Sequence, residues 1–218
     1  MGNNKTTVGL VYGGKSGEHE VSLQTAFAVM NAFDYDKYEL IPFYITKQGE
    51  WRKGTTLQAP LGKLDQLKLE QSQEGTEAAL GAIFSRLYGG EAGIDLMFPL
   101  LHGTFGEDGT IQGLFEMANI PYVGAGVLAS AAGMDKAVMK KLFAQAGLPQ
   151  CGYRFFTKSQ WERSSFNLIM GVEDDLGYPC FVKPANLGSS VGISKARNRE
   201  ELEQAIELAF RYDLKVIV

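Results

Sequence analysis

The order of apolar runs in the first 45 residues constrains the fold more than any other feature. Val8 to Tyr12 is a short apolar run that ends at Gly13 and Gly14, and a segment with helical spacing of apolar residues follows it. A second strand is expected from Tyr38 to Ile45. Strand-helix-strand units join parallel strands with a right-handed crossover in nearly all proteins. The sequence therefore predicts an open parallel α/β sheet at the N-terminus.

The helix after the first strand is expected to begin at Ser16, a residue type that caps helix N-termini. Its core-facing side is expected to carry Val21, Thr25, Ala28, Val29 and Ala32. Residues 54–76 are polar and indicate an irregular loop. A nearly continuous apolar run from Ile94 to Leu101 predicts a strand buried on both faces, and it ends at His102. Functional groups gather at the carboxyl ends of strands in such sheets, so His102 is a candidate site residue, although it could equally be a core histidine.

The second half of the chain has a different pattern. Helices are expected at Val127–Ala132 and Lys136–Ala146, and short β-rich segments follow Pro149. These segments, expected to pair in antiparallel hairpins, are Tyr153–Phe156, Cys180–Lys183 and Val191–Ser194. Asn198 is expected to cap a helix that buries Leu202, Ala205, Ile206 and Ala209, and a last strand begins at Leu214. We place a domain boundary near Ala125, which gives an α/β domain (1–125) and an α+β domain (126–218).

Composition narrows the class of partner. With 218 residues and 45% apolar residues, the chain can bury a substantial core as a globular protein. A net charge of −4 and no cluster of basic residues argue against nucleic acid or a membrane surface as partners. Cys151 and Cys180 have no cysteine or histidine at metal-binding spacing and are expected to be reduced. With no signal segment and no 18-residue apolar run, we expect a cytoplasmic protein.

A small-residue loop suits phosphate binding. Lys183 ends one β-branched run, and the loop from Gly188 to Gly192 leads into another. Glycine and serine let backbone N–H groups approach an anion, and the lysine adds a positive charge beside them. The alternative is an ordinary hairpin turn with a solvated lysine.

Gly9 to Ser16 matches the letter pattern of a Walker A loop, but its context argues against one. In a P-loop the strand ends before the first glycine, whereas here Leu10, Val11 and Tyr12 are strand formers. A P-loop nucleotide-binding protein remains the alternative from a different functional class.

Two further positions have both a functional and a purely structural interpretation. Glu18 would lie in the first turn of a helix at a strand's carboxyl end, where it could hold an ammonium group or simply favour the helix N-terminus. Asp135 is expected to cap the helix that begins at Lys136, and Lys136 alone would be read as a solvated surface lysine.

Taken together, five blocks resemble the D-alanine–D-alanine ligase family of ATP-grasp enzymes. They are GGKSGEHEVS (13–22), LHGTFGEDGTIQG (101–113), YVGAG (122–126), MDK (134–136) and VKPANLGSSVG (182–192), in the order in which the family has them. The resemblance implies an N-terminal substrate domain, a central ATP-grasp domain, and a C-terminal domain that this chain would lack. We therefore expect a fragment of a longer protein.

The resemblance also implies a reaction. The carboxylate of one D-alanine would attack the γ-phosphate of ATP, and the amine of a second D-alanine would displace phosphate from the acyl phosphate, for peptidoglycan precursor synthesis. Glu18 would hold the first ammonium, with His102 beside the same substrate and Ser189 in a network with Glu18, so that Glu18 and Ser189 are the expected catalytic pair. The residues implied at ATP are Lys136, Lys183, Gly188, Ser189, Ser190 and Val191.

The family's Mg²⁺ ligands lie in the domain expected to be missing, so no metal ligand is expected here and the 218-residue chain alone is expected to be inactive. The family is commonly dimeric, which implies a homodimer. A D-alanine–D-lactate or D-serine ligase is a close variant, and a non-catalytic binding module is a third possibility.

Overall fold

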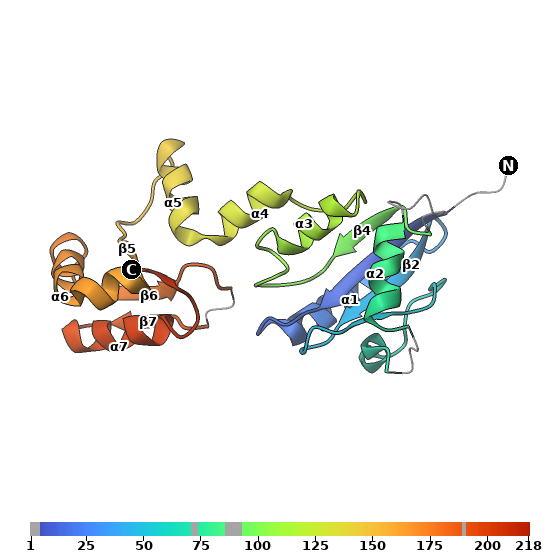
Figure 1. Ribbon diagram of the computed structural model, residues 1–218, viewed down its shortest axis with the longest axis horizontal. Helices are drawn as coiled ribbons and strands as arrows, with labels where there is room; N and C mark the ends of the chain where they lie inside the picture. The colour runs from blue at the N-terminus through green and yellow to red at the C-terminus, as the bar shows by residue number, and fades with distance from the viewer. Residues whose placement is uncertain (1–4, 71–73, 86–92, 189–190) are drawn as a thin grey trace. The chain divides into compact units, whose positions relative to one another are not determined.

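The computed structural model describes residues 5–70, 74–85, 93–188 and 191–218 (Figure 1). The chain divides into two compact units, Met1–Ser130 and Ala131–Val218. This division falls a few residues beyond the boundary that the sequence indicates near Ala125. Each unit has its own four-stranded sheet.

The first unit is an α/β sheet with helices on both faces. Its elements are β1 (Thr6–Gly13), α1 (His19–Ala32), β2 (Tyr38–Ile45), β3 (Trp51–Lys53), the 3-10 helix η1 (Leu64–Lys68), α2 (Thr76–Phe84), β4 (Leu96–Pro99) and α3 (Thr110–Met117). The strand order is β3-β2-β1-β4. β1 pairs in parallel with β2 and β4, which confirms the predicted parallel sheet, and β3 adds a short antiparallel edge strand.

Side chains alternate between the two faces of β1, so the first unit has one core cluster on each face of its sheet. Val8, Leu10 and Tyr12 face a cluster that contains Leu23 and Met30 of α1. The opposite face packs against α2 and α3, in a cluster whose members include Val11, Phe43, Met97, Ile83 and Phe115. Both faces of the sheet are covered by helices. A ligand is therefore expected to bind at the carboxyl ends of the strands.

The predicted core-facing side of α1 is wrong. Val21 is 48% exposed, and the buried residues of the helix are His19, Ser22, Leu23, Ala26 and Met30. Two of these are polar, and each is hydrogen-bonded: His19 to the Gly14 carbonyl and Ser22 to the Gly13 N–H and the Leu100 carbonyl. An apolar pattern places polar residues in solvent, so it predicts the wrong buried face for a helix whose buried residues include hydrogen-bonded His19 and Ser22.

α4 (Val127–Met134) crosses the division between the units, and the second unit is an antiparallel α+β domain. Its remaining elements are α5 (Lys136–Gln145), β5 (Phe155–Thr157), α6 (Lys158–Asp175), β6 (Cys180–Pro184), β7 (Ser194–Ala196), α7 (Arg199–Ala209) and β8 (Lys215–Ile217). The strand order is β5-β8-β6-β7, and each neighbouring pair is antiparallel, as the sequence predicts.

The sheet of the second unit has one covered face. Val182 and Val216 pack with residues of α6 and α7, including Val172, Leu202 and Ile206. Because side chains alternate along a strand, Phe181 and Lys183 of β6 point to the other face. That face lines a cavity together with residues of α5. Both cysteines carry free thiols, with Cys151 exposed and Cys180 buried.

Two local predictions in this unit are corrected. The strand expected at Val191–Ser194 lies instead at Ser194–Ala196, because Gly192 has a φ of 70°, which a strand does not allow. The helix α6 is not among the elements predicted from the sequence. Its N-terminus is a capping box in which the Thr157 hydroxyl accepts from the Gln160 N–H and the Gln160 side chain accepts from the Thr157 N–H.

Candidate active site

The carboxyl ends of β1 and β4 bring two predicted site segments together. The strands pair in parallel with Val11 opposite Pro99, and the Leu100 N–H donates to the Val11 carbonyl at 2.7 Å. The glycine turn after β1 and the loop after β4 therefore start side by side. Ser16 joins them, because its hydroxyl donates to the His102 carbonyl at 2.6 Å and accepts from the Glu18 N–H at 3.2 Å. Ser16 thus connects the two loops and does not cap α1, which begins at His19 with no side-chain cap.

Glu18 lies against the loop that follows β4. A Cβ built on Gly103 would come within 2.3 Å of the Glu18 Oε2 atom, so the carboxylate occupies space that only a glycine leaves open. Gly103 also has a φ of 71°, which independently favours glycine. The Gly103 N–H donates to Glu107 at 2.6 Å, which holds this loop in place. An anionic carboxylate is therefore positioned at the strand edge, next to His102.

His102 is partly buried at the same edge. Its Nε2 lies 3.0 Å from the Thr25 hydroxyl of α1, and its carbonyl accepts from Ser16. The ring is therefore held by Thr25 and the backbone by Ser16, while the residue stays partly exposed. That a substrate reaches His102 stays a prediction.

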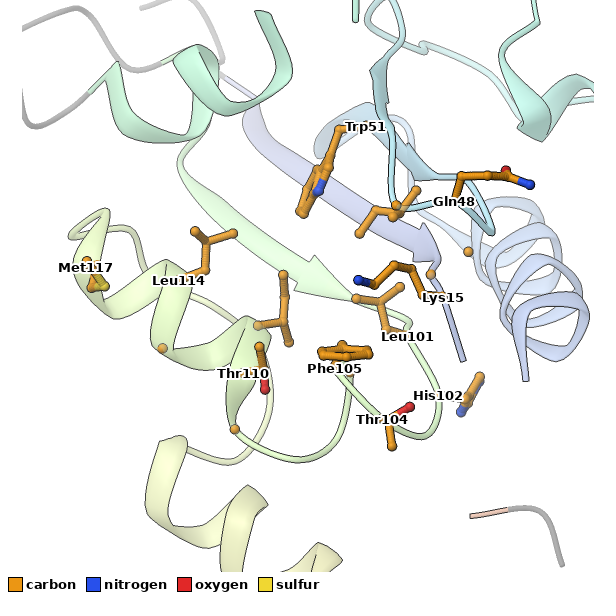
Figure 2. A pocket seen from close by; sticks show the side chains of 18 residues that line it. Lys15, Gln48, Trp51, Leu101, His102, Thr104, Phe105, Thr110, Leu114 and Met117 are labelled. Atoms are coloured by element: carbon orange, nitrogen blue, oxygen red, sulfur yellow. The ribbon is translucent and has the colours of Figure 1, made fainter. Parts of the chain in front are cut away.

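A cavity of about 710 Å³ adjoins this edge, and Figure 2 shows the side chains around it. His102 lines it together with Lys15, Trp51, Phe105 and Leu114. The Lys15 ammonium lies 4.7 Å from the centre of the Phe105 ring, a cation–π contact. The walls are mainly apolar, and Lys15 and His102 are among the polar residues that line them.

The segment that matches the Walker A pattern is a strand. β1 runs unbroken from Thr6 to Gly13, and Gly9 pairs with Ile41 on one side and Met97 on the other. Its backbone groups are committed to the sheet and cannot wrap a phosphate. The P-loop alternative is therefore wrong for this segment.

Lys136 and Lys183 line one cavity of about 690 Å³ in the second unit. Lys136 is the first residue of α5, and Lys183 lies on β6. The Lys136 ammonium donates to the Leu187 carbonyl at 2.7 Å. Burial, and secondly the positive charge of Lys183, lower the pKa of Lys136 below its usual value. Two cationic side chains therefore line the same cavity, an arrangement suited to an anion.

The start of α5 is held by a partly buried ion pair. The Asp135 carboxylate accepts from the N–H groups of Ala137 and Val138, which caps the helix as predicted. It also pairs with the Lys215 ammonium of β8. Burial opposes ionisation of Asp135, but the Lys215 hydrogen bond and the backbone donors outweigh it, so the pKa of Asp135 lies below its usual value. This pair ties the helix that carries Lys136 to the sheet.

The predicted phosphate loop is only partly within the described residues. Gly188 is partly exposed and Val191 is 38% exposed, and the Val191 N–H donates to the Gly188 carbonyl at 3.4 Å. Ser189 and Ser190 lie outside the described residues.

Sequence reasoning missed the residues that support this loop and cavity. Asp213 accepts from the Asn186 backbone N–H at 2.7 Å and from its side chain at 3.1 Å, so it anchors the start of the loop. Lys215 was not singled out either. Neither residue belongs to a recognisable local motif, and each is brought to the site by the antiparallel pairing of β6 with β8.

Across residues 5–70, 74–85, 93–188 and 191–218, no group of three or more histidine, cysteine or acidic side chains could hold a metal ion. Within these same ranges, every helix is too short or too polar to cross a lipid bilayer.

Two family models match the chain. The model described as the D-ala D-ala ligase N-terminus matches residues 7–125, and the model described as the D-ala D-ala ligase C-terminus matches residues 142–218. The D-alanine–D-alanine ligase of Bacillus velezensis is 57% identical over 213 residues, which is 95% of this chain and 60% of that relative. The ligase of Geobacillus kaustophilus is 53% identical, over 98% of this chain and 59% of its own length.

Solved structures agree with these matches. The VanG D-Ala:D-Ser ligase from Enterococcus faecalis is 37% identical with a TM-score of 0.80, over 98% of this chain and 62% of that chain. The D-alanine-D-alanine ligase from Coxiella burnetii is 29% identical with a TM-score of 0.76, over 98% of this chain and 63% of that chain. The chain thus spans about 60% of the length of the curated relatives that it matches.

Proposed function

Because the chain belongs to the D-alanine–D-alanine ligase family, we propose that it carries the first-substrate site and much of the ATP site of an enzyme that joins two D-alanines. ATP activates the first D-alanine as an acyl phosphate, and the second amine displaces phosphate to form the dipeptide of the peptidoglycan precursor. The observation that carries the proposal is the pair of lysines facing one cavity.

In this proposal the first unit holds the amino acid. Glu18 binds the ammonium group of the first D-alanine, and His102 lies beside the same substrate. A zwitterion held at its ammonium end leaves its carboxylate free to react. The glycine at position 103 supports this role, since a larger residue there would displace the Glu18 carboxylate. From the family, we also propose Ser189 as a catalytic residue.

The second unit holds the nucleotide. Bringing a carboxylate to about 4 Å from a phosphate oxygen costs about 4 kcal/mol for each pair of charges at an effective dielectric constant near 20. Lys136 and Lys183 offset this repulsion by placing positive charge against the phosphates. From the family, Gly188, Ser189, Ser190 and Val191 are proposed to contribute to ATP binding.

The described residues of this chain do not form a magnesium site. Mg²⁺ prefers carboxylate oxygens in a near-octahedral arrangement, and no suitable acidic cluster is present among those residues. We propose, from the family, that the Mg²⁺ used with ATP is bound by residues outside this chain.

D-Alanine is the proposed second substrate, because curated relatives that are 57% and 53% identical are D-alanine–D-alanine ligases. The similarity to a D-Ala:D-Ser ligase keeps D-serine, and with it D-lactate, as the second candidate. We also propose, from the family alone, that the enzyme is a cytoplasmic homodimer. Light scattering with size-exclusion chromatography measures the oligomeric state.

Calorimetric titration with ATP tests the lysine assignment. We expect Lys136→Ala and Lys183→Ala each to weaken ATP binding by about tenfold or more, because each removes a cation from the phosphates. Lys141→Ala is the matched control on the same helix, since its exposed side chain does not line the cavity. Lys15→Ala tests the P-loop alternative. Loss of binding in Lys15→Ala, or unchanged binding in Lys183→Ala, contradicts the proposal.

A further inference from the structure

His19 is a buried titratable residue that the proposed chemistry does not use. It is 3% exposed and follows Glu18 directly in the chain. We propose that His19 is a positioning residue: its Nδ1–H, donated to the Gly14 carbonyl, fixes the turn that places the Glu18 carboxylate. This inference rests on the proposed function of Glu18 and extends it to a residue that never touches substrate.

The contacts of the ring define which nitrogen carries the proton. Nδ1 lies 2.6 Å from the Gly14 carbonyl oxygen, and a carbonyl can only accept a hydrogen bond. Nδ1 must therefore be protonated. Nε2 lies 3.2 Å from the buried hydroxyl of Tyr44, which donates to it when the ring is neutral. The Nδ1–H tautomer satisfies both nitrogens.

Both backbone polar groups of Gly14 are hydrogen-bonded. Its N–H donates to the Ile45 carbonyl at 2.8 Å, and its carbonyl accepts from His19. Gly13 and Gly14 have φ values of 91° and 94°, and a Cβ on Gly13 would come within 2.2 Å of the Ile45 carbonyl oxygen. These hydrogen bonds leave the turn few alternative conformations. The direction of the backbone that follows Gly14 is therefore fixed.

Glu18 lies between two anchors of this turn. On one side Ser16 accepts from the Glu18 N–H and donates to the His102 carbonyl, and on the other side His19 is tied to Gly14. Only a short loop separates Gly14 from His19, so movement of either end is transmitted to the Glu18 backbone. A group that binds a substrate ion must be held to within a fraction of an ångström to be effective.

The tautomer can be measured directly. The chain has two histidines, so two-bond proton–nitrogen correlation spectra of the ¹⁵N-labelled chain contain two imidazoles, and His102→Asn assigns them. In mildly alkaline buffer we expect a protonated Nδ1 and an unprotonated Nε2 for His19. An Nε2–H tautomer, or averaged shifts from rapid tautomer exchange, overturns the proposal.

Two amide substitutions separate positioning from packing. His19→Asn places an N–H donor at the same number of bonds from Cα as Nδ1, whereas His19→Gln places it where Nε2 was. We expect D-alanine affinity, followed by NMR titration with L-alanine as control, to fall less than about threefold in His19→Asn and about tenfold or more in His19→Gln. Equal losses in the two variants contradict the proposal.

These measurements distinguish failure of the inference from failure of the proposed function. If the wild-type chain binds neither D-alanine nor L-alanine, the assignment of Glu18 is contradicted, while the His19 spectrum still decides the tautomer. If both variants unfold, thermal unfolding shows it, and the spectrum of the wild-type chain again decides the inference.

Discussion

The ammonium group of Lys136 lies where its charge is disfavoured. Burial and the neighbouring Lys183 both favour loss of its proton, and Asp213 and Asp135 act in the opposite direction. An anion in the cavity would reverse this preference. Binding of a polyphosphate and protonation of Lys136 therefore favour each other, which is the linkage expected of a site built for phosphate.

Asp135 leads to a prediction about stability and pH. Its pKa is lowered in the folded chain, so its ion pair stabilises the second unit above the unfolded pKa of about 3.9, and this stability is lost as the pH falls through the lower folded pKa. We expect Asp135→Asn to lower the free energy of unfolding near neutral pH by about 1–3 kcal/mol, with a smaller loss in acid. Urea unfolding at several pH values measures both.

Asp175→Asn is the matched control for Asp135→Asn. Asp175 pairs with Arg154 at 2.6 Å, but both side chains are well exposed, so its removal should cost less than about 1 kcal/mol. A loss in Asp135→Asn that is as small as the control, or independent of pH, would show that the Asp135–Lys215 pair does not stabilise the unit.

At the scale of the element, α1 gives the clearest stability prediction. Leu23 is fully buried against β1, and Val21 is 48% exposed on the opposite side of the helix. We expect Leu23→Ala to lower the free energy of unfolding by about 2–5 kcal/mol and Val21→Ala to change it by about 0.5 kcal/mol or less. Chemical denaturation measures both losses. A larger loss in Val21→Ala than in Leu23→Ala would mean that the face predicted from the sequence is the buried one.

Elements with a strong local signal could be predicted, and others could not. β1, β2, α5 and α7 follow from apolar period and caps, since Asp135 and Asn198 do accept backbone N–H groups. The start of β7 could not be placed, because Gly192 has a left-handed φ and lies close to Tyr212 and Pro184, contacts that no short window of sequence contains. α6 could have been found from its capping box at Thr157.

The candidate site was predictable as a set of residue types but not as a geometry. The motifs name Glu18, His102, Lys136 and Lys183, yet no local pattern shows that both lysines line one cavity. Supporting residues such as Lys215 come from strands distant in the chain, where pairing rather than sequence neighbourhood brings them in. Long-range contacts of this kind are not contained in any short window of sequence.

At the scale of the whole molecule, each unit has its own core and one tryptophan. Trp51 packs against the core of the first unit, and Trp161 stacks on Phe156 in the second. We expect two unfolding transitions, reported by fluorescence of Trp161→Phe and Trp51→Phe respectively, because separate cores need not unfold together. Coincident midpoints and slopes in both variants would indicate a single cooperative unit.

The alternation of side chains between the two faces of β6 limits which changes in its sequence are tolerated. Phe181 and Lys183 face the cavity, whereas Val182 packs in the core and Cys180 contacts both the core and the cavity. Deleting or inserting one codon before Lys183 would exchange the two faces, burying the cation in hydrocarbon and turning valine towards the ligand. Mutational scanning should therefore find this strand intolerant of any change in length.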